Sequence, residues 1–218
     1  MTASVKRAMT LTAALNRLTF DDAAQIRILF SELIGKTVDD SFLLIPPFFT
    51  TGGADISVGR NVFINQNCTF YDLGGLDIAD DVMIGPNVSL ITSGHPIEPA
   101  QRRACVIAKP IVIERNVWIA AGAIVNPGST IGDGAVINTG ATVDHDCIIG
   151  DYANVSPGCH LSGRTRIGRY AFLGTGVVTL PDAEIGEDAV VGAGAVVLKT
   201  VENGRTVGGV PARELRRP

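Results

Sequence analysis

The chain has 218 residues and a formal net charge of −4, which disfavours nucleic acid or an anionic membrane surface as its partner. Hydrophobic residues make up 46% of the chain but aromatic residues only 6%, so we expect one domain with a narrow core of aliphatic side chains. Because no apolar run has the length of a membrane span and the N-terminal segment lacks a signal-peptide pattern, we expect a cytoplasmic protein.

Residues 1–50 are expected to form a helical cap. Apolar residues recur at helical spacing between residues 23 and 34, with Phe20-Asp21-Asp22 as the N-terminal cap and Gly35 as the stop signal. A weaker helical pattern covers residues 5 to 17. Pro46 and Pro47 then interrupt the chain. Such a cap would cover strand edges that the open end of a repeat structure leaves unpaired.

A six-residue repeat dominates the rest of the chain. An aliphatic residue or Thr occupies every sixth position from Ile113 to Val197, and the fourth residue after each is small or β-branched. Two of every six side chains can therefore fill a narrow interior, which is typical of a parallel β-helix. The sixth-position residues are Ile113, Ile119, Val125, Ile131, Ile137, Val143, Ile149, Val155, Leu161, Ile167, Leu173, Thr179, Ile185, Val191 and Val197.

A second period of 18 residues defines the coil. Gly132, Gly150, Gly168 and Gly186 recur at this interval, which is three hexads, so each coil should be a triangle of three short strands. Glycine at a recurring corner suggests a turn with unusual backbone angles. The repeat begins near Val58 in other phases. We expect the β-helix to cover residues 51–201 and a short tail to cover residues 202–218.

One segment breaks the period. The step from Leu90 to Ile113 is 23 residues, which is not a whole number of hexads, so a loop at about residues 92–109 should leave the prism. It contains Ser93-Gly94-His95-Pro96. A long loop that interrupts a rigid repeat is where function is expected, and this loop holds one of three histidines.

The histidines are the candidate catalytic groups. His95 is in the loop, His145 is at a corner between Asp144 and Asp146, and His160 should face outward from a strand. A histidine beside a carboxylate can act as a general base near neutral pH, although a solvated surface histidine is the simpler alternative. Three of the four cysteines occupy inward positions and none forms a Cys-x-x-Cys pair, so we expect core cysteines and no metal.

Residues 15–135 resemble the galactoside and maltose O-acetyltransferases. The resemblance rests on Asn65-Gln66-Asn67-Cys68 through Asp72, Ile84-Gly85-Pro86-Asn87-Val88, Ser93-Gly94-His95-Pro96, Lys109-Pro110-Ile111 and Asn116-Val117-Trp118-Ile119. It implies a left-handed β-helix, a homotrimer with sites between subunits, and transfer of an acetyl group from acetyl-CoA to a sugar hydroxyl. It also implies that His95 is the general base and that Thr51, Asn65 and Asp72 surround the sugar.

Residues 120–218 resemble another branch, the sialic-acid O-acetyltransferases and bacillosamine-type N-acetyltransferases. The motifs are residues 137–147, Ser156-Pro157-Gly158 and residues 207–213. The resemblance implies that His145 is the base and Asp146 its orienting partner. Together the two resemblances imply an acetyl-CoA groove. Its residues would be Trp118, Gly140, Ala141, Gly158, Gly176, Lys199 and Arg213.

The two resemblances do not share one register. Lys199 follows Trp118 by 81 residues, which is three coils more than the spacing in the first branch. Three extra coils would displace this lysine by roughly 14 Å along the axis. His95 and His145 are 50 residues apart, on the order of 13 Å along the axis, so we expect two separate sites. One of the two histidines would then be a relict.

The resemblances imply direct acetyl transfer with a histidine base and without an acyl-enzyme. N-acetylation of an amino sugar, free or nucleotide-linked, is the first alternative. A non-catalytic trimeric scaffold is the second. A carbonic anhydrase with three zinc-bound histidines is disfavoured, because the three histidines are unevenly spaced along the chain and occupy different hexad positions.

Overall fold

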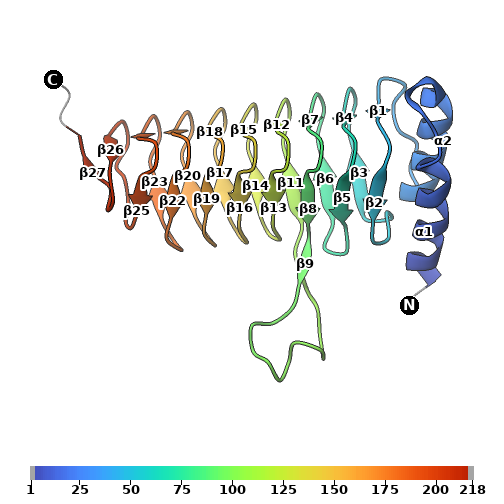
Figure 1. Ribbon diagram of the computed structural model, residues 1–218, viewed down its shortest axis with the longest axis horizontal. Helices are drawn as coiled ribbons and strands as arrows, with labels where there is room; N and C mark the ends of the chain where they lie inside the picture. Colours follow the sequence, from blue (N-terminus) through green and yellow to red (C-terminus); the bar gives the residue numbers. More distant parts are fainter. Residues whose placement is uncertain (1–2, 216–218) are drawn as a thin grey trace.

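Three parallel β-sheets form the sides of a long triangular prism in the computed structural model, which describes residues 3–215 (Figure 1). The chain winds through about nine turns, with two helices over the N-terminal end. The predicted β-solenoid is confirmed. Of the predicted cap and tail, residues 1–2 and 216–218 lie outside the described residues.

Each sheet takes one strand from each coil. Sheet A contains β1 (Leu43–Leu44), β4 (Phe63–Ile64), β7 (Met83–Ile84), β12 (Trp118–Ile119), β15 (Val136–Ile137), β18 (Asn154–Val155), β21 (Phe172–Leu173), β24 (Val190–Val191), β26 (Thr206–Gly208) and the antiparallel β27 (Arg213–Glu214). Sheet B contains β2 (Phe48–Thr50), β5 (Cys68–Tyr71), β8 (Ser89–Ile91), β13 (Ile124–Val125), β16 (Thr142–Val143), β19 (His160–Leu161), β22 (Val178–Thr179) and β25 (Val196–Val197). Sheet C contains β3 (Ile56–Val58), β6 (Leu76–Ile78), β11 (Ile111–Ile113), β14 (Thr130–Ile131), β17 (Ile148–Ile149), β20 (Arg166–Ile167) and β23 (Glu184–Ile185).

The hexad residues fill the interior as predicted. The sixth-position residues from Ile113 to Val197 are at most 3% exposed, and Cys68, Cys147 and Cys159 are buried among them. Burial raises the pKa of the Cys147 thiol to about 11, which suits a core residue and not a nucleophile. The inward Thr179 is buried with its hydroxyl 2.9 Å from that of Thr165, so this polar pair is satisfied inside the prism.

The first coils are longer than the later ones. Phe63 pairs with Met83 on the following coil, whereas Trp118 pairs with Val136. The earlier coil therefore holds two more residues than the later one. This difference explains why the sequence repeat before Leu90 runs in other phases.

The glycines that recur every 18 residues were predicted to adopt unusual backbone angles, and this prediction is wrong. Gly132, Gly150, Gly168 and Gly186 do not have positive φ. A Cβ on Gly150 would lie 2.7 Å from the Arg169 nitrogen, so close approach of the next coil requires glycine there. Several glycines with positive φ form another column, which turns the chain from sheet A to sheet B. Its members include Gly122, Gly140, Gly158, Gly176 and Gly194.

Two helices continue the core beyond the first coil. Helix α1 (Ala3–Leu15) packs on α2 (Ala23–Ile34), and Phe30 of α2 stacks on Phe42 at 4.7 Å. Gly35 ends α2 with φ 68°, as expected. The predicted cap at the start differs: residues 20–22 form the 3₁₀ turn η1 (Phe20–Asp22), and the Asp22 carboxylate accepts from Thr19 instead of capping α2. Neither described helix has the length and apolar character of a membrane span.

The loop predicted from the broken period leaves the prism after β8 (Figure 1). Its two ends form a short antiparallel pair, β9 (Ser93–Gly94) and β10 (Ile107–Ala108). The chain then returns to the solenoid at Pro110 and enters β11. The loop therefore projects from the edge between sheets B and C.

Candidate functional site

Six of the candidate residues lie along one edge of the prism. This edge, the B/C edge, is where the chain leaves sheet B and enters sheet C. Successive turns at this edge contain Thr51 after β2, Asp72 after β5, the loop after β8 and residues 144–146 after β16. Lys199 follows β25 on the same edge, three coils beyond His145.

A pocket of about 590 Å³ brings His95 and His145 together. The expectation of two separate sites is therefore wrong. The sequence between the two histidines includes the extruded loop, which does not advance along the axis. Strand β8 is separated from β16 only by β13, so the two histidines arise from edges two coils apart. The pocket is lined by Ser93, Gly94, His95, Pro96, Ile97, Glu98, Ile107, Lys109, Asn126, Pro127, Asp144, His145 and Asp146.

His145 is held by its carboxylate neighbours. Its Nδ1 lies 3.0 Å from Oδ2 of Asp146, and its backbone N–H donates to Oδ1 of Asp144 at 2.7 Å. With Nδ1 donating to Asp146, the neutral imidazole keeps its lone pair on Nε2. The arrangement suits a general base, because the carboxylate fixes the ring and stabilises the imidazolium that forms.

Asp146 also accepts from a lysine at the end of the loop. Its Oδ1 lies 2.6 Å from Nζ of Lys109. Partial burial opposes ionisation, but hydrogen bonds from Lys109 and His145 outweigh it and lower the pKa of Asp146 below its ordinary value. Asp146 is therefore an anion at neutral pH.

Two glycines make room for this cluster. A Cβ on Gly163 would lie 2.5 Å from Nε2 of His145, so the imidazole rests directly on the backbone of the next coil. A Cβ on Gly128 would lie 2.4 Å from Oδ1 of Asp146. Gly163 itself is buried, with the ring packed against its backbone.

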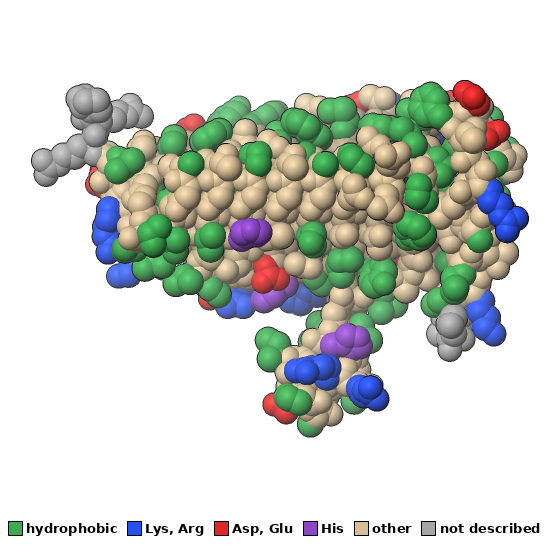
Figure 2. Space-filling model, in the orientation of Figure 1, with side chains coloured by type: hydrophobic (Ala, Val, Ile, Leu, Met, Phe, Trp, Pro, Cys, Tyr) green, Lys and Arg blue, Asp and Glu red, His purple; other side chains and the backbone are tan. Residues whose placement is uncertain are grey.

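His95 has a less fixed position. It is exposed, and within residues 3–215 its ring has no hydrogen-bond partner. The neighbouring Pro96 is buried, and Arg102 donates to the Ile97 carbonyl oxygen at 2.7 Å. The space-filling view shows a histidine on the extruded loop beside basic side chains (Figure 2). The loop itself is thus braced, whereas the His95 imidazole is free to meet a ligand.

The residues expected around a sugar do not line this pocket. Asp72 is 2% exposed and accepts from the Thr50 hydroxyl and from the N–H groups of Gly52 and Asp55. It therefore organises the preceding turn. Thr51 Oγ1 is buried without a partner among the described residues. Asn65 lies on the edge between sheets A and B, and its Oδ1 accepts from the Gln66 N–H at 2.8 Å.

The residues expected to bind acetyl-CoA fall into three groups. Gly140, Gly158 and Gly176 lie on the edge between sheets A and B, and a Cβ on any of them would face open space. Ala141, beside them, is buried and its N–H donates to the Asn138 carbonyl oxygen.

Lys199 and Arg213 form the second group and line one pocket of about 500 Å³ near the C-terminal end. The third group is Trp118, which is 44% exposed on sheet A. Within one chain the three groups do not meet.

Lys109 and Gly163 are site residues that sequence reasoning missed, although Lys109 is part of a motif quoted above. Close approach of Gly163 to a ring in the preceding coil has no sequence signal of its own.

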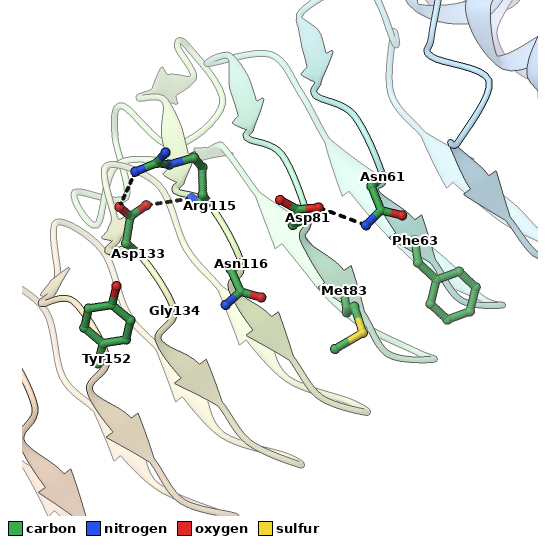
Figure 3. Close-up of a pocket in the computed structure, with 9 residues that line it drawn as sticks. All are labelled: Asn61, Phe63, Asp81, Met83, Arg115, Asn116, Asp133, Gly134 and Tyr152. Atoms are coloured by element: carbon green, nitrogen blue, oxygen red, sulfur yellow. Dashed lines mark hydrogen bonds and ion pairs between the residues drawn. The ribbon is translucent and has the colours of Figure 1, made fainter.

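Another groove follows the edge between sheets C and A (Figure 3). Its corner residues form ladders: Arg115 pairs with Asp133 at 3.0 Å, and Asn61 donates to Asp81 at 2.9 Å. The lining contains no histidine, and its two carboxylates are engaged by Arg115 and Asn61. Residues 3–215 contain no group of three His, Cys, Asp or Glu side chains arranged to hold a metal ion.

Sheet A has a mostly apolar outer face. Met83 and Trp118 are paired neighbours on adjacent strands, and Trp118 pairs in turn with Val136. Phe172, 42% exposed, continues the row toward Val190, and Asn154 alone interrupts it. Rows of hydrophobic side chains run along the visible side of the prism (Figure 2).

Comparisons with known proteins agree with the fold and the repeat. The bacterial transferase hexapeptide (six repeats) model matches residues 110–145 and 164–199. Galactoside O-acetyltransferase of Escherichia coli is 40% identical over 101 residues, which are 46% of this chain and 50% of that protein. The chain spans about half the length of the curated relatives it matches.

Solved structures give the same result. The acetyltransferase domain of PglB from Neisseria gonorrhoeae, in complex with acetyl coenzyme A, is 36% identical with a TM-score of 0.52, covering 62% of this chain and 58% of that one. UDP-N-acetylglucosamine O-acyltransferase from Moraxella catarrhalis is 16% identical with a TM-score of 0.67, covering 82% of this chain and 71% of that one, which shows a shared fold alone. The solenoid is the left-handed parallel β-helix, and the resemblance to hexapeptide-repeat transferases is confirmed.

Proposed function

Because the chain carries hexapeptide repeats of the bacterial transferase family, we propose that it is an acetyltransferase that moves the acetyl group of acetyl-CoA to a sugar hydroxyl. The observation that carries this proposal is the convergence of His95 with the His145–Asp146 pair in one pocket. The names of the relatives and their complexes with acetyl-CoA or CoA support the same reaction class.

His145 is the general base in this proposal. Asp146 holds Nδ1, which leaves Nε2 to take the proton from the acceptor hydroxyl as its oxygen attacks the thioester carbonyl carbon. The C–S bond then breaks, and the imidazolium returns the proton to the CoA thiolate. This mechanism requires no covalent acyl-enzyme, because the thioester is already activated.

His95 is assigned a role in holding the acceptor. It lines the same pocket, but no carboxylate of residues 3–215 bonds to its ring. Apolar groups of Pro96, Ile97, Ile107 and Pro127 line the pocket around it and would exclude water from the reacting atoms.

The donor is proposed to extend along the B/C edge from His145 toward the C-terminal end. Lys199 and Arg213 line one pocket there, and their positive charges suit the phosphates of CoA. Lys199 is three coils from His145, or ~14 Å along the axis at about 4.8 Å per coil. The glycines Gly140, Gly158 and Gly176 border the opposite edge of sheet B.

We further propose a cytoplasmic homotrimer. The apolar row on sheet A, centred on Trp118, is the surface proposed to pack against other copies, since exposed rows of this kind favour association.

Two alternatives have their own support. N-acetylation of an amino sugar is implied by the resemblance of residues 120–218 to the bacillosamine-type N-acetyltransferases. A non-catalytic scaffold would follow if the two parts of the chain no longer shared a site, but the common pocket of His95 and His145 argues against it.

The direct test is release of free CoA thiol by the wild-type protein with acetyl-CoA and a panel of neutral sugars, amino sugars and nucleotide-linked amino sugars. The proposal predicts turnover with neutral sugars and an O-acetyl product by mass spectrometry. Turnover only with amines would establish the N-acetyltransferase. If the protein neither turns over nor binds acetyl-CoA, the result would support the non-catalytic scaffold.

A further inference from the structure

The extruded loop reaches the candidate base through one side chain. Nζ of Lys109, at the foot of the loop, donates to Oδ1 of Asp146, far along the chain on a later coil. The other oxygen, Oδ2, faces Nδ1 of His145 at 3.0 Å. Asp146 therefore lies between a cation from the loop and the imidazole from the coil, with one oxygen for each.

Both ends of this bridge are fixed by backbone contacts. The Lys109 N–H donates to the Thr92 carbonyl oxygen at 2.9 Å, and the Lys109 backbone packs so closely on Gly74 that a Cβ there would lie 2.5 Å from the lysine carbonyl oxygen. The Asp146 N–H donates to the Pro127 carbonyl oxygen at 2.9 Å. Gly128 provides the space between them, since a Cβ at that position would meet both side chains.

The bridge contributes little to stability. The Lys109 and Asp146 side chains are 48% and 30% exposed, and exposed ion pairs of this kind typically contribute little to the free energy of unfolding. Its effect is therefore expected at the carboxylate, whose second oxygen contacts the base.

We propose that Lys109 is a positioning residue that orients Asp146 toward His145 and sets the pH range in which His145 works as the base. This inference rests on the proposed role of His145. A cation on Asp146 offsets part of the negative potential at the imidazole, so the imidazolium is less stabilised and the base stays unprotonated to lower pH. The hydrogen bond also keeps the carboxylate from rotating away from Nδ1.

The other ionisable groups near His145 do not replace this contact. They are Asp144 on the same corner, Arg164 and Asp182 on the following coils, and His95 and Glu98 in the loop. Arg164 is paired with Asp182, which leaves Lys109 as the cation that contacts Asp146 among residues 3–215.

The test compares Lys109→Met, Lys109→Gln and Lys109→Arg with wild type in full pH–rate profiles. We expect the neutral variants to lower kcat about tenfold and to move the acidic limb upward by about 0.5–1 pH unit, and the Arg variant to restore both. Arg60→Met is the matched control, because Arg60 pairs with Asp80 at 2.7 Å, away from the pocket, and Asp80 is 29% exposed. It should leave the profile unchanged. An unmoved acidic limb in both neutral variants would overturn the proposal, whether kcat falls or the acceptor KM rises.

A second readout does not depend on turnover. The imidazole nitrogen signals of His145, assigned with His145→Ala, are followed by NMR as the pH is changed without acetyl-CoA. The proposal predicts that the ring gains its proton at higher pH in Lys109→Met than in wild type. An identical titration would refute the role of Lys109 even if the wild type proved inactive, and a shifted titration in an inactive protein would count against the proposed reaction alone.

Discussion

Gly163 lies directly beneath the imidazole of His145, so close that a Cβ on the glycine would be 2.5 Å from Nε2. Gly163→Ala must therefore displace the ring or the coil. We expect acetyl transfer to fall by about 10²-fold or more, because the proposed base moves. Turnover and CD spectra of the purified variant provide the measurement.

Gly192→Ala is the control for this change. Its Cβ would be 3.4 Å from the nearest atom, the Val207 carbonyl oxygen, and it follows β24 on a different edge. It should keep nearly full activity. Equal activity in Gly163→Ala and wild type would show that His145 does not need its present position.

Acid should destabilise the fold through several paired aspartates. Hydrogen bonds from Arg115 lower the pKa of Asp133, and hydrogen bonds from Arg60 lower that of Asp80. A folded-state pKa below the unfolded value means that the stabilisation is present above about pH 4 and is lost as the pH falls through the folded pKa. The free energy of unfolding, from urea titrations at pH 7, 5, 4 and 3, should be nearly constant down to pH 5 and then decline. Asp133→Asn should decline less steeply below pH 4, and an unchanged slope would contradict this account.

Adjacent residues on strand β17 test the packing of the core. Ile149 is 1% exposed, whereas Ile148 is 39% exposed on the outer face. Ile149→Ala should reduce the free energy of unfolding by about 2–5 kcal/mol, because it leaves a cavity in a narrow interior. Ile148→Ala should cost clearly less. Similar losses in the two variants would mean that the inward and outward positions are wrongly assigned.

Trp118 is expected to lie at the subunit interface. Light scattering after size exclusion should give the mass of three chains for the wild type and a smaller mass for Trp118→Glu, since a carboxylate in an apolar contact is costly to bury. Ile148→Glu, on sheet C, should remain trimeric. A trimer that survives Trp118→Glu would place the interface elsewhere. A monomeric wild type would exclude the homotrimer.

Much of the fold was predictable because its geometry repeats. A side-chain period of six fixes which residues point inward, so the burial of residues such as Ile131 and Ala135 follows from spacing alone. The role of Gly150 did not follow, because a clash between neighbouring coils is a contact across one full turn of the solenoid and has the same sequence appearance as a strained turn. The longer coils at the start of the solenoid appear in the sequence only as a change in the phase of the six-residue repeat.

The site was predictable in its members but not in its arrangement. His95, His145 and Asp146 were identified from residue type and neighbours. That they share a pocket depends on the loop leaving and re-entering the solenoid at nearly the same height, which a count of residues misses. Lys109 contacts Asp146 only because the loop returns at Pro110 beside the turn that follows β13, and no local pattern records that contact.

His145 and His95 share one pocket, and we propose that the first is the working base and the second supports the acceptor. The most direct measurement is acetyl-CoA turnover in wild type, His95→Ala, His145→Ala and the double variant under the same conditions. We predict a loss of about 10²–10⁴-fold for His145→Ala, a smaller loss seen mainly in the acceptor KM for His95→Ala, and a double variant little worse than His145→Ala. Full activity in His145→Ala, with loss only in His95→Ala, would contradict the account and assign the base to the loop.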